Sequence, residues 1–160
     1  MSEQTPEKGP AVRFPPPFVP LIALGAGMLL HWVQPLSTTT VVGNGGRFAI
    51  GGALVFAGLA SMGLAIGWFR KTGQDPKPWT ESPELILEGV YKWTRNPMYL
   101  GMGLLQAGLG VFLGSLWPLL LVPVTWCVIY LIAIRHEETY LSKKFGESYD
   151  GYRASVRRWL

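Results

Sequence analysis

The sequence predicts an all-α integral membrane bundle of about four transmembrane helices, followed by a cytosolic helical tail. Hydrophobic residues make up 49% of the 160 residues and charged residues only 15%, whereas a soluble domain carries roughly 25% charge. The apolar residues also gather in four separate stretches, and two of these reach the roughly 20 residues that a membrane-spanning helix needs. The chain length allows one compact domain.

The first 17 residues differ in composition from the rest of the chain. Residues 1–17 are polar and rich in proline, and no small-residue cleavage site follows the first apolar stretch. We therefore expect a disordered N-terminal tail, not a cleavable signal peptide. Residues 18–160 are expected to form one transmembrane domain. Its apolar stretches cover residues 18–36, 48–69, 98–113 and 116–134. The first has polar residues near its end and the third is short, so these two are the weaker candidates for spanning helices.

The distribution of lysine and arginine predicts the orientation in the membrane. Five basic residues lie between the second and third stretches and six follow the fourth, whereas the two opposite loops contain only Arg47. By the positive-inside rule, both termini and the second loop are cytoplasmic. If the chain is bacterial, the membrane is the inner (plasma) membrane. The chain has a net charge of +4. We expect its basic residues to pair with lipid headgroups, so no nucleic-acid partner is expected.

The third and fourth stretches are joined by only a few residues, 115–118, and must form an antiparallel hairpin. The polar start of the hairpin, residues 89–101, then lies beside its polar end at the cytoplasmic face. That end includes Glu137 and Glu138, which would oppose the helix dipole at a helix C-terminus unless a cation pairs with them. A charged cluster at a bilayer boundary is a functional candidate. The spacing thus predicts a site for a cationic or mixed-charge ligand.

Some short patterns in this region have an ordinary structural explanation. Asn96 followed by Pro97 is typical of a helix start, with Asn as the N-cap and Pro at the first helical position. Small residues four apart, such as Gly63 and Gly67, let helices pack closely in a membrane. Neither pattern indicates chemistry by itself.

Two motifs together resemble the isoprenylcysteine carboxyl methyltransferase and phospholipid methyltransferase superfamily. The first is Gly-x-Tyr-x-x-x-Arg-Asn-Pro-x-Tyr-x-Gly at residues 89–101, and the second follows about forty residues later. The second consists of Glu137, Glu138, Leu141, Phe145, Gly146, Tyr149, Tyr152 and Val156. The resemblance covers residues 72–159. It implies a small membrane enzyme that transfers a methyl group from S-adenosylmethionine to a lipid or another lipophilic acceptor, with its cofactor site in residues 89–160.

The resemblance assigns roles to individual residues. The cofactor-binding set is Arg95, Asn96, Pro97, Tyr99, Gly101, Gly103, Glu137, Glu138, Tyr149 and Tyr152. The catalytic set is Arg95, Asn96, Arg153 and Arg157. The two glycines would let the backbone approach the cofactor closely, and the two glutamates would hold its amino group or its ribose hydroxyls. The resemblance implies no metal ion.

Two departures from the family pattern bear on the acceptor. Asn96 stands where carboxyl-methylating members typically have histidine, and Ser155 stands where they tend to have arginine. Arginine is the natural clamp for a carboxylate, and Arg153 and Arg157 are near Ser155 but out of register. We therefore favour an amine or a neutral lipophile as the acceptor over a prenylcysteine carboxylate.

Two other functions remain open at this stage. The first is a membrane reductase that uses NADPH, because sterol reductases have a distantly similar C-terminal region, although they are normally much longer. The second is a non-catalytic membrane interaction module that its polar hairpin end anchors. A binding measurement distinguishes the three functions: a methyltransferase binds S-adenosylmethionine, a reductase binds NADPH, and an interaction module binds neither. No feature of the sequence indicates an oligomeric state.

Overall fold

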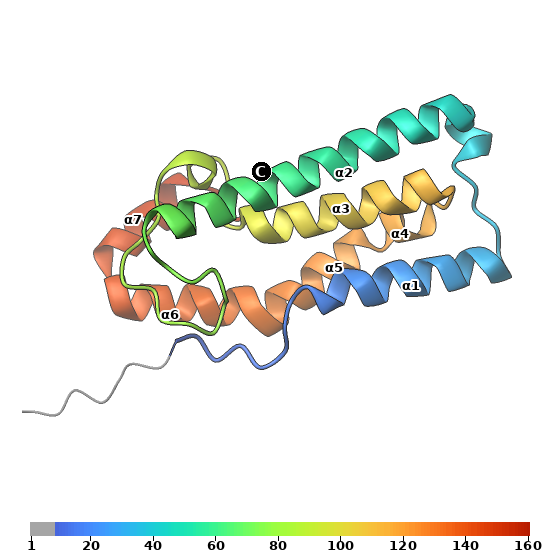
Figure 1. The fold of residues 1–160 in the computed structure, drawn as a ribbon. Helices are drawn as coiled ribbons and strands as arrows, with labels where there is room; N and C mark the ends of the chain where they lie inside the picture. The colour runs from blue at the N-terminus through green and yellow to red at the C-terminus, as the bar shows by residue number, and fades with distance from the viewer. Residues whose placement is uncertain (1–8) are drawn as a thin grey trace, which may run out of the picture.

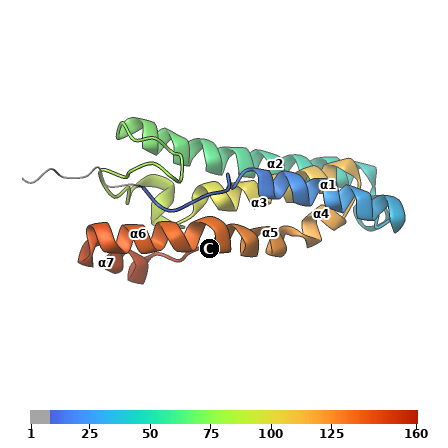
Figure 2. The ribbon, with the colours of Figure 1, turned by 90° about the horizontal axis from the view of Figure 1, so that it is seen from below.

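The computed structural model describes residues 9–160, and its regular elements are all helical, which confirms the all-α prediction. Three helices, α1 (Phe18–Val33), α2 (Thr39–Lys71) and α3 (Pro97–Leu113), precede a nearly continuous helical run. This run consists of α4 (Trp117–Leu120), α5 (Val122–Ile129), the π-helical turn η2 (Tyr130–Ile134) and α6 (Arg135–Phe145). The short 3₁₀ turn η1 (Gly89–Lys92) precedes α3, and α7 (Glu147–Ser155) follows α6. The helices lie side by side in an elongated bundle (Figures 1 and 2).

Two of these helices are long and apolar enough to cross a membrane, namely Thr39–Lys71 and the run Trp117–Phe145. They correspond to the second and fourth apolar stretches. The helices α1 and α3 have 16 and 17 residues and are apolar but shorter. For α1 and α3, a membrane-spanning position therefore remains a prediction.

Two helix boundaries differ from the prediction. Helix α2 begins at Thr39, inside the segment expected to be a loop, and bends at Gly43, whose φ of 69° only glycine adopts without strain. At the other end, the fourth helix continues past residue 134 to Phe145. Glu137 and Glu138 thus lie within a helix and not at its C-terminus, so the argument from the helix dipole does not apply to them.

Glycines bring α2 and α3 into close contact. A Cβ atom at Gly58 would lie 2.7 Å from the carbonyl oxygen of Gly101, and one at Gly101 would lie 2.6 Å from that of Gly58. This is the close backbone approach that small residues permit in membranes. The predicted pair Gly63 and Gly67 is not part of this contact, because both positions face open space. At Gly63 and Gly67, the spacing of small residues therefore does not mark a packed face.

A buried polar side chain in the bundle has its hydrogen bonds satisfied. The Gln106 side chain donates to the carbonyl oxygen of Pro118 at 2.8 Å and accepts from the Thr125 hydroxyl at 2.7 Å. Such bonds between helices stabilise packing where no water is present to compete. They join α3 to the fourth helix and so support the hairpin that the sequence predicts.

The proline-rich segment 9–17 is packed against the bundle, although the sequence suggested disorder for residues 1–17. Val12 is 8% exposed and belongs to an apolar cluster with Val19, Tyr99 and Met102. Pro16 is fully buried. Prolines reduce the entropy of the unfolded chain, so an extended apolar segment orders at a modest cost. Residues 1–8, the rest of the predicted tail, lie outside the described residues.

The N-terminal segment, the loop between α2 and α3, and helices α6 and α7 all lie at one end of the bundle (Figures 1 and 2). The connection between α1 and α2 lies at the opposite end. This arrangement follows from the alternating directions of the helices. The polar segments that the sequence singled out thus meet at one end.

Candidate functional site

A carboxylate shared by two arginines is the centre of the polar end. Glu138 forms an ion pair with Arg95 Nη1 at 3.1 Å and accepts hydrogen bonds from Arg158 Nε and Nη2 at 2.9 Å each. The Arg95 and Glu138 side chains are only 9% and 12% exposed. The hydrogen bonds with Glu138 raise the pKa of Arg158, and bidentate contacts of this kind are strong. Glu138 therefore has two cationic partners.

The chain after α7 is fastened to the start of α3 by its own carbonyl groups. The Arg95 amide donates to the carbonyl oxygen of Arg157 at 3.0 Å. The Arg158 carbonyl oxygen accepts from the Thr94 hydroxyl at 3.1 Å and from Asn96 Nδ2 at 3.0 Å. Asn96 does occupy the N-cap position, with Pro97 next, but its side chain makes no capping bond. Its amide holds the tail instead.

Two tyrosines of α7 face the same region. The Tyr152 hydroxyl donates to the carbonyl oxygen of Tyr91 at 2.7 Å, and the Tyr149 hydroxyl accepts from Arg95 Nη1 at 3.4 Å. Burial raises the pKa of both phenols. Both hydroxyls therefore stay protonated at neutral pH, and the proton of Tyr149 remains available for a hydrogen bond, because Tyr152 already donates its own to Tyr91.

Arg95 and Glu137 each retain binding capacity that the protein does not use. Arg95 Nε is buried and has no hydrogen-bond partner among residues 9–160, which is rare for a buried donor. Glu137 accepts a hydrogen bond from the Tyr99 hydroxyl, and within the described part of the chain no ion pair involves it. Arg95 thus has one unpaired donor, and Glu137 has a carboxylate without a cationic partner among the described residues.

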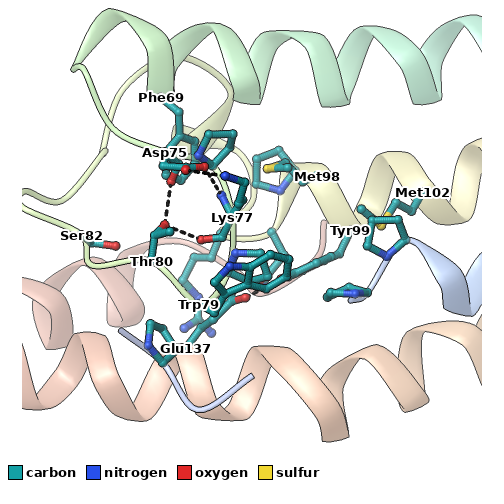
Figure 3. A pocket seen from close by; sticks show the side chains of 18 of the residues that line it. Phe69, Asp75, Lys77, Trp79, Thr80, Ser82, Met98, Tyr99, Met102 and Glu137 are labelled. Carbon is teal, nitrogen blue, oxygen red and sulfur yellow. Dashed lines mark hydrogen bonds and ion pairs between the residues drawn. The ribbon is translucent and has the colours of Figure 1, made fainter. Parts of the chain in front are cut away.

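Two neighbouring cavities share the wall that contains these groups. The larger has a volume of about 320 Å³ and lies between the N-terminal segment, the α2–α3 loop, the start of α3 and α6 (Figure 3). The smaller, of about 90 Å³, lies beside α7. Both are lined by Phe69, Ser82, Tyr91, Arg95, Asn96, Glu137 and Leu141.

Most of the residues predicted to bind the cofactor come together at these cavities. The larger cavity is lined by Arg95, Asn96, Pro97, Tyr99 and Glu137. The smaller is lined by Arg95, Asn96, Glu137, Glu138, Tyr149 and Tyr152. Gly101 and Gly103 are not among the described lining residues of either cavity. Their missing side chains make room for α2 and for Trp126 of α5, so the close approach they permit is between helices.

Two of the three arginines predicted to be catalytic, Arg153 and Arg157, lie elsewhere. The Arg157 side chain is exposed, and this residue contributes its carbonyl group to the site. Arg153 is exposed in a separate groove on the outer side of α6, with Arg135 and Lys143. Among the described residues lining either cavity, neither arginine occurs. Arg158 takes the central position instead, because α7 ends at Ser155 and the extended backbone at Val156 turns the chain back.

Three contributors to the site have no local sequence pattern that predicts them. These are Arg158, the prolines of the N-terminal segment and Trp79 of the α2–α3 loop. Arg158 has no spacing that distinguishes it from the other arginines of a basic tail. The prolines had been attributed to disorder. Trp79 lies in the polar loop before the motif at residues 89–101, and no local pattern marks it as a site residue.

The chain is similar in sequence to known methyltransferases. A model of the phospholipid methyltransferase family matches residues 38–148. The chain is 33% identical over 72 residues to the protein-S-isoprenylcysteine O-methyltransferase of Schizosaccharomyces pombe, a match that covers 45% of this chain and 30% of that protein. It is 41% identical over 63 residues to an uncharacterized protein of Haemophilus influenzae, covering 39% of this chain and 100% of that protein. The match thus spans less than a third of the curated methyltransferase.

Proposed function

Because the chain belongs to the phospholipid methyltransferase family, we propose that it is a membrane enzyme that transfers a methyl group from S-adenosylmethionine to a lipophilic acceptor. One observation carries the choice of cofactor. The unused Arg95 Nε donor and the unpaired Glu137 carboxylate both belong to residues that line a cavity of about 320 Å³. Ligand pockets for small molecules have volumes of roughly 300–1,000 Å³, so this cavity is large enough for a cofactor.

The chemistry of the wall fits the amino-acid end of S-adenosylmethionine. This end carries one carboxylate and one ammonium group. Arg95 Nε would donate to the carboxylate, and Glu137 would accept from the ammonium, which gives two charge-assisted hydrogen bonds. The Tyr99 hydroxyl fixes the orientation of the Glu137 carboxylate. Glu138 is already engaged by two arginines, and its role is to hold Arg95 in place.

The residues of the site contribute positioning and exclusion of water. When bound, S-adenosylmethionine supplies a methyl group on a sulfonium whose sulfur leaves as a neutral thioether, so the step needs little acid–base help. Arg95 and Glu137 would fix the cofactor, and holding two reactants at near-attack distance lowers the barrier substantially. The proline and methionine side chains of the larger cavity exclude water, which favours an amine nucleophile. The C-terminal chain, tied to Thr94 and Asn96, closes the site on the other side.

The charges around the larger cavity favour an uncharged or amine acceptor. Its cationic lining residues are Lys77, which pairs with Asp75 at 2.9 Å, and Arg95, which pairs with Glu138. The remaining donor of Arg95 is assigned to the cofactor carboxylate, so neither residue is left to bind an acceptor carboxylate as well. A phospholipid amine or a neutral lipophile therefore fits better than a prenylcysteine carboxylate.

Calorimetry on the purified protein in detergent tests the cofactor assignment. We expect S-adenosylhomocysteine, the product form of the cofactor, to bind the wild type saturably. Glu137→Gln should weaken binding about tenfold to a hundredfold, because a hydrogen bond to a charged group contributes about 1.5–3 kcal/mol. The matched control is Glu88→Gln, at an exposed glutamate outside both cavities. A wild type that binds NADPH instead would indicate a reductase, and one that binds neither would indicate a non-catalytic membrane module.

The acceptor is tested separately with a labelled methyl donor. Prenylcysteine and phosphatidylethanolamine are offered side by side in mixed micelles, and labelled lipid is measured. We expect phosphatidylethanolamine to be the better acceptor. Turnover of prenylcysteine alone would contradict the amine assignment while leaving the cofactor assignment intact.

A further inference from the structure

We propose that Trp79 binds the adenine ring of the cofactor by stacking, and that the N-terminal segment 9–17 positions Trp79 for this contact. The inference rests on the proposed function and extends it to two segments that the motifs do not include. The N-terminal segment lies outside the family match of residues 38–148. Trp79 lies within the match, but in a loop well before the motif at residues 89–101.

The two sides of the larger cavity differ in character. The side formed by α3 and α6 presents Arg95, Asn96 and Glu137. The facing side is formed by the loop around Trp79 and by Pro10 and residues 15–17. Trp79 lies among the lining side chains in the same view as Tyr99 and Glu137 (Figure 3). The cavity thus has one wall with Arg95 and Glu137, and a facing wall rich in proline and aromatic surface in which the charges of Asp75 and Lys77 pair with each other.

This division matches the two ends of S-adenosylmethionine. The wall with Arg95 and Glu137 complements the zwitterionic amino-acid end, as argued above. The other end of the molecule is a flat, uncharged purine, for which a tryptophan face is a suitable partner, because stacking on an aromatic side chain binds a base through its π-face. The Trp79 side chain is 44% exposed, so part of its surface is free to contact a ligand. If Arg95 and Glu137 bind the amino-acid end of the cofactor, its purine end points toward Trp79.

The N-terminal segment restrains the loop at Trp79. The Gly9 backbone lies directly on that of Trp79 and Thr80, and a Cβ atom at Gly9 would lie 2.6 Å from the Thr80 carbonyl oxygen. No L-residue other than glycine fits there without moving one of the two segments. Val12, three residues later, is buried in the apolar core, so the segment is fixed at that point. The loop is therefore held between the core and the cavity.

The competing explanation is that Trp79 is only an interfacial anchor, which is a common role for tryptophan at a membrane boundary. An anchoring tryptophan would affect membrane insertion and leave cofactor binding unchanged. The two explanations are separable because two ligands probe the cavity differently. S-adenosylhomocysteine has both ends of the cofactor, whereas 5′-methylthioadenosine has the purine and lacks the amino-acid end.

The test measures the affinity of both ligands by calorimetry on the full-length protein in detergent. Trp79→Ala should weaken both ligands about fivefold to a hundredfold, which is the range found when a base loses an aromatic partner. Trp79→Phe should restore most of the affinity. Glu137→Gln should weaken S-adenosylhomocysteine and leave 5′-methylthioadenosine unchanged. The matched control, Trp93→Ala, removes a tryptophan that is 78% exposed and outside both cavities, and should change neither affinity.

A second variant tests the role of the N-terminal segment. Gly9→Ala should displace the loop and weaken both ligands in the same proportion, by less than Trp79→Ala does. Gly63→Ala, at a position that faces open space, is its control. If Trp79→Ala binds both ligands as the wild type does, the inference is wrong and the proposed function survives. If the wild type binds neither ligand, both fail. If only S-adenosylhomocysteine weakens in Trp79→Ala, the ring contacts the amino-acid end and the adenine assignment is wrong.

Discussion

Two adjacent glutamates have different surroundings, and we expect their substitution to have different consequences. Glu138 is held by Arg95 and Arg158 in a mostly buried ion-pair network. Glu137 contacts the Tyr99 hydroxyl and has no cation of its own in the described residues. The first glutamate therefore contributes to the stability of the protein, and the second is available to a ligand.

Substitution of Glu138 should destabilise the fold. Glu138→Ala would leave two guanidinium groups without their counter-charge, and breaking a buried ion pair from one side costs about 3–5 kcal/mol. Arg158 is 36% exposed and recovers some hydration, so we expect the lower end of this range. Unfolding in detergent, followed by circular dichroism, measures the difference from the wild type and from the exposed control Glu88→Ala. Equal stability of Glu138→Ala and its control would show that the network contributes nothing.

At the scale of elements, the π-helical turn Tyr130–Ile134 determines which way α6 presents its glutamates. A π-turn contains one residue more than the α-helix it interrupts, and such turns are frequent at functional sites. The contacts of Glu137 with Tyr99 and of Glu138 with Arg95 both lie directly after it. The turn thus sets the rotation of α6 about its axis, so that Glu137 and Glu138 face the start of α3.

Deletion of Leu131 tests this role. Removing one residue should convert the turn to α-helix and rotate α6 by about 100° relative to α5, given 3.6 residues per turn. Glu137 and Glu138 would then turn away from α3. We expect helix content to stay unchanged while S-adenosylhomocysteine binding is lost. Leu131→Ala, which shortens a side chain that is 44% exposed and keeps the register, is the control. Full binding in the deletion variant would rule out a role for the turn.

The contact of α2 with α3 gives a second prediction at this scale. Gly101→Ala would place a Cβ atom 2.6 Å from the Gly58 carbonyl oxygen, so the helices must separate, and overpacking of this kind costs about 1–3 kcal/mol. Gly63→Ala should be close to neutral. Thermal unfolding monitored in detergent compares the two variants. Normal stability of Gly101→Ala together with a loss of cofactor affinity would instead support the role that the family resemblance gives to Gly101.

At the scale of the whole molecule, the sequence predicts those contacts that short connections between helices impose. The short connection at residues 115–118 requires a hairpin, and the hairpin brings Tyr99 to Glu137. Arg158 could not be predicted in the same way, because its position depends on the extended backbone at Val156. Ordering of the N-terminal segment also depends on tertiary contacts, those that Val12 makes in the core. Residues placed by long-range packing carry no local pattern.

The orientation of the molecule in the membrane is the remaining prediction from the sequence. The second loop and the tail after the fourth stretch hold eleven basic residues between them, whereas the opposite loops hold only Arg47. The structure brings this loop and tail to one end of the bundle, so a single insertion satisfies the positive-inside rule for both. In this predicted orientation the site would open toward the cytoplasm, where a water-soluble cofactor would reach it without crossing the bilayer.

Labelling with a membrane-impermeant maleimide tests this orientation. Cys127 is exposed on the protein and is the only native cysteine, so Cys127→Ser provides the background. Cysteines are then introduced by Asn44→Cys at one end of the bundle and by Glu88→Cys at the end with the site, both at exposed positions that leave the number of basic residues unchanged. We expect intact cells to label position 44 only, and position 88 to react after the membrane is permeabilised. The reverse pattern would place the site outside the cell, away from a cytoplasmic supply of S-adenosylmethionine, and would contradict both the orientation and the proposed route of the cofactor.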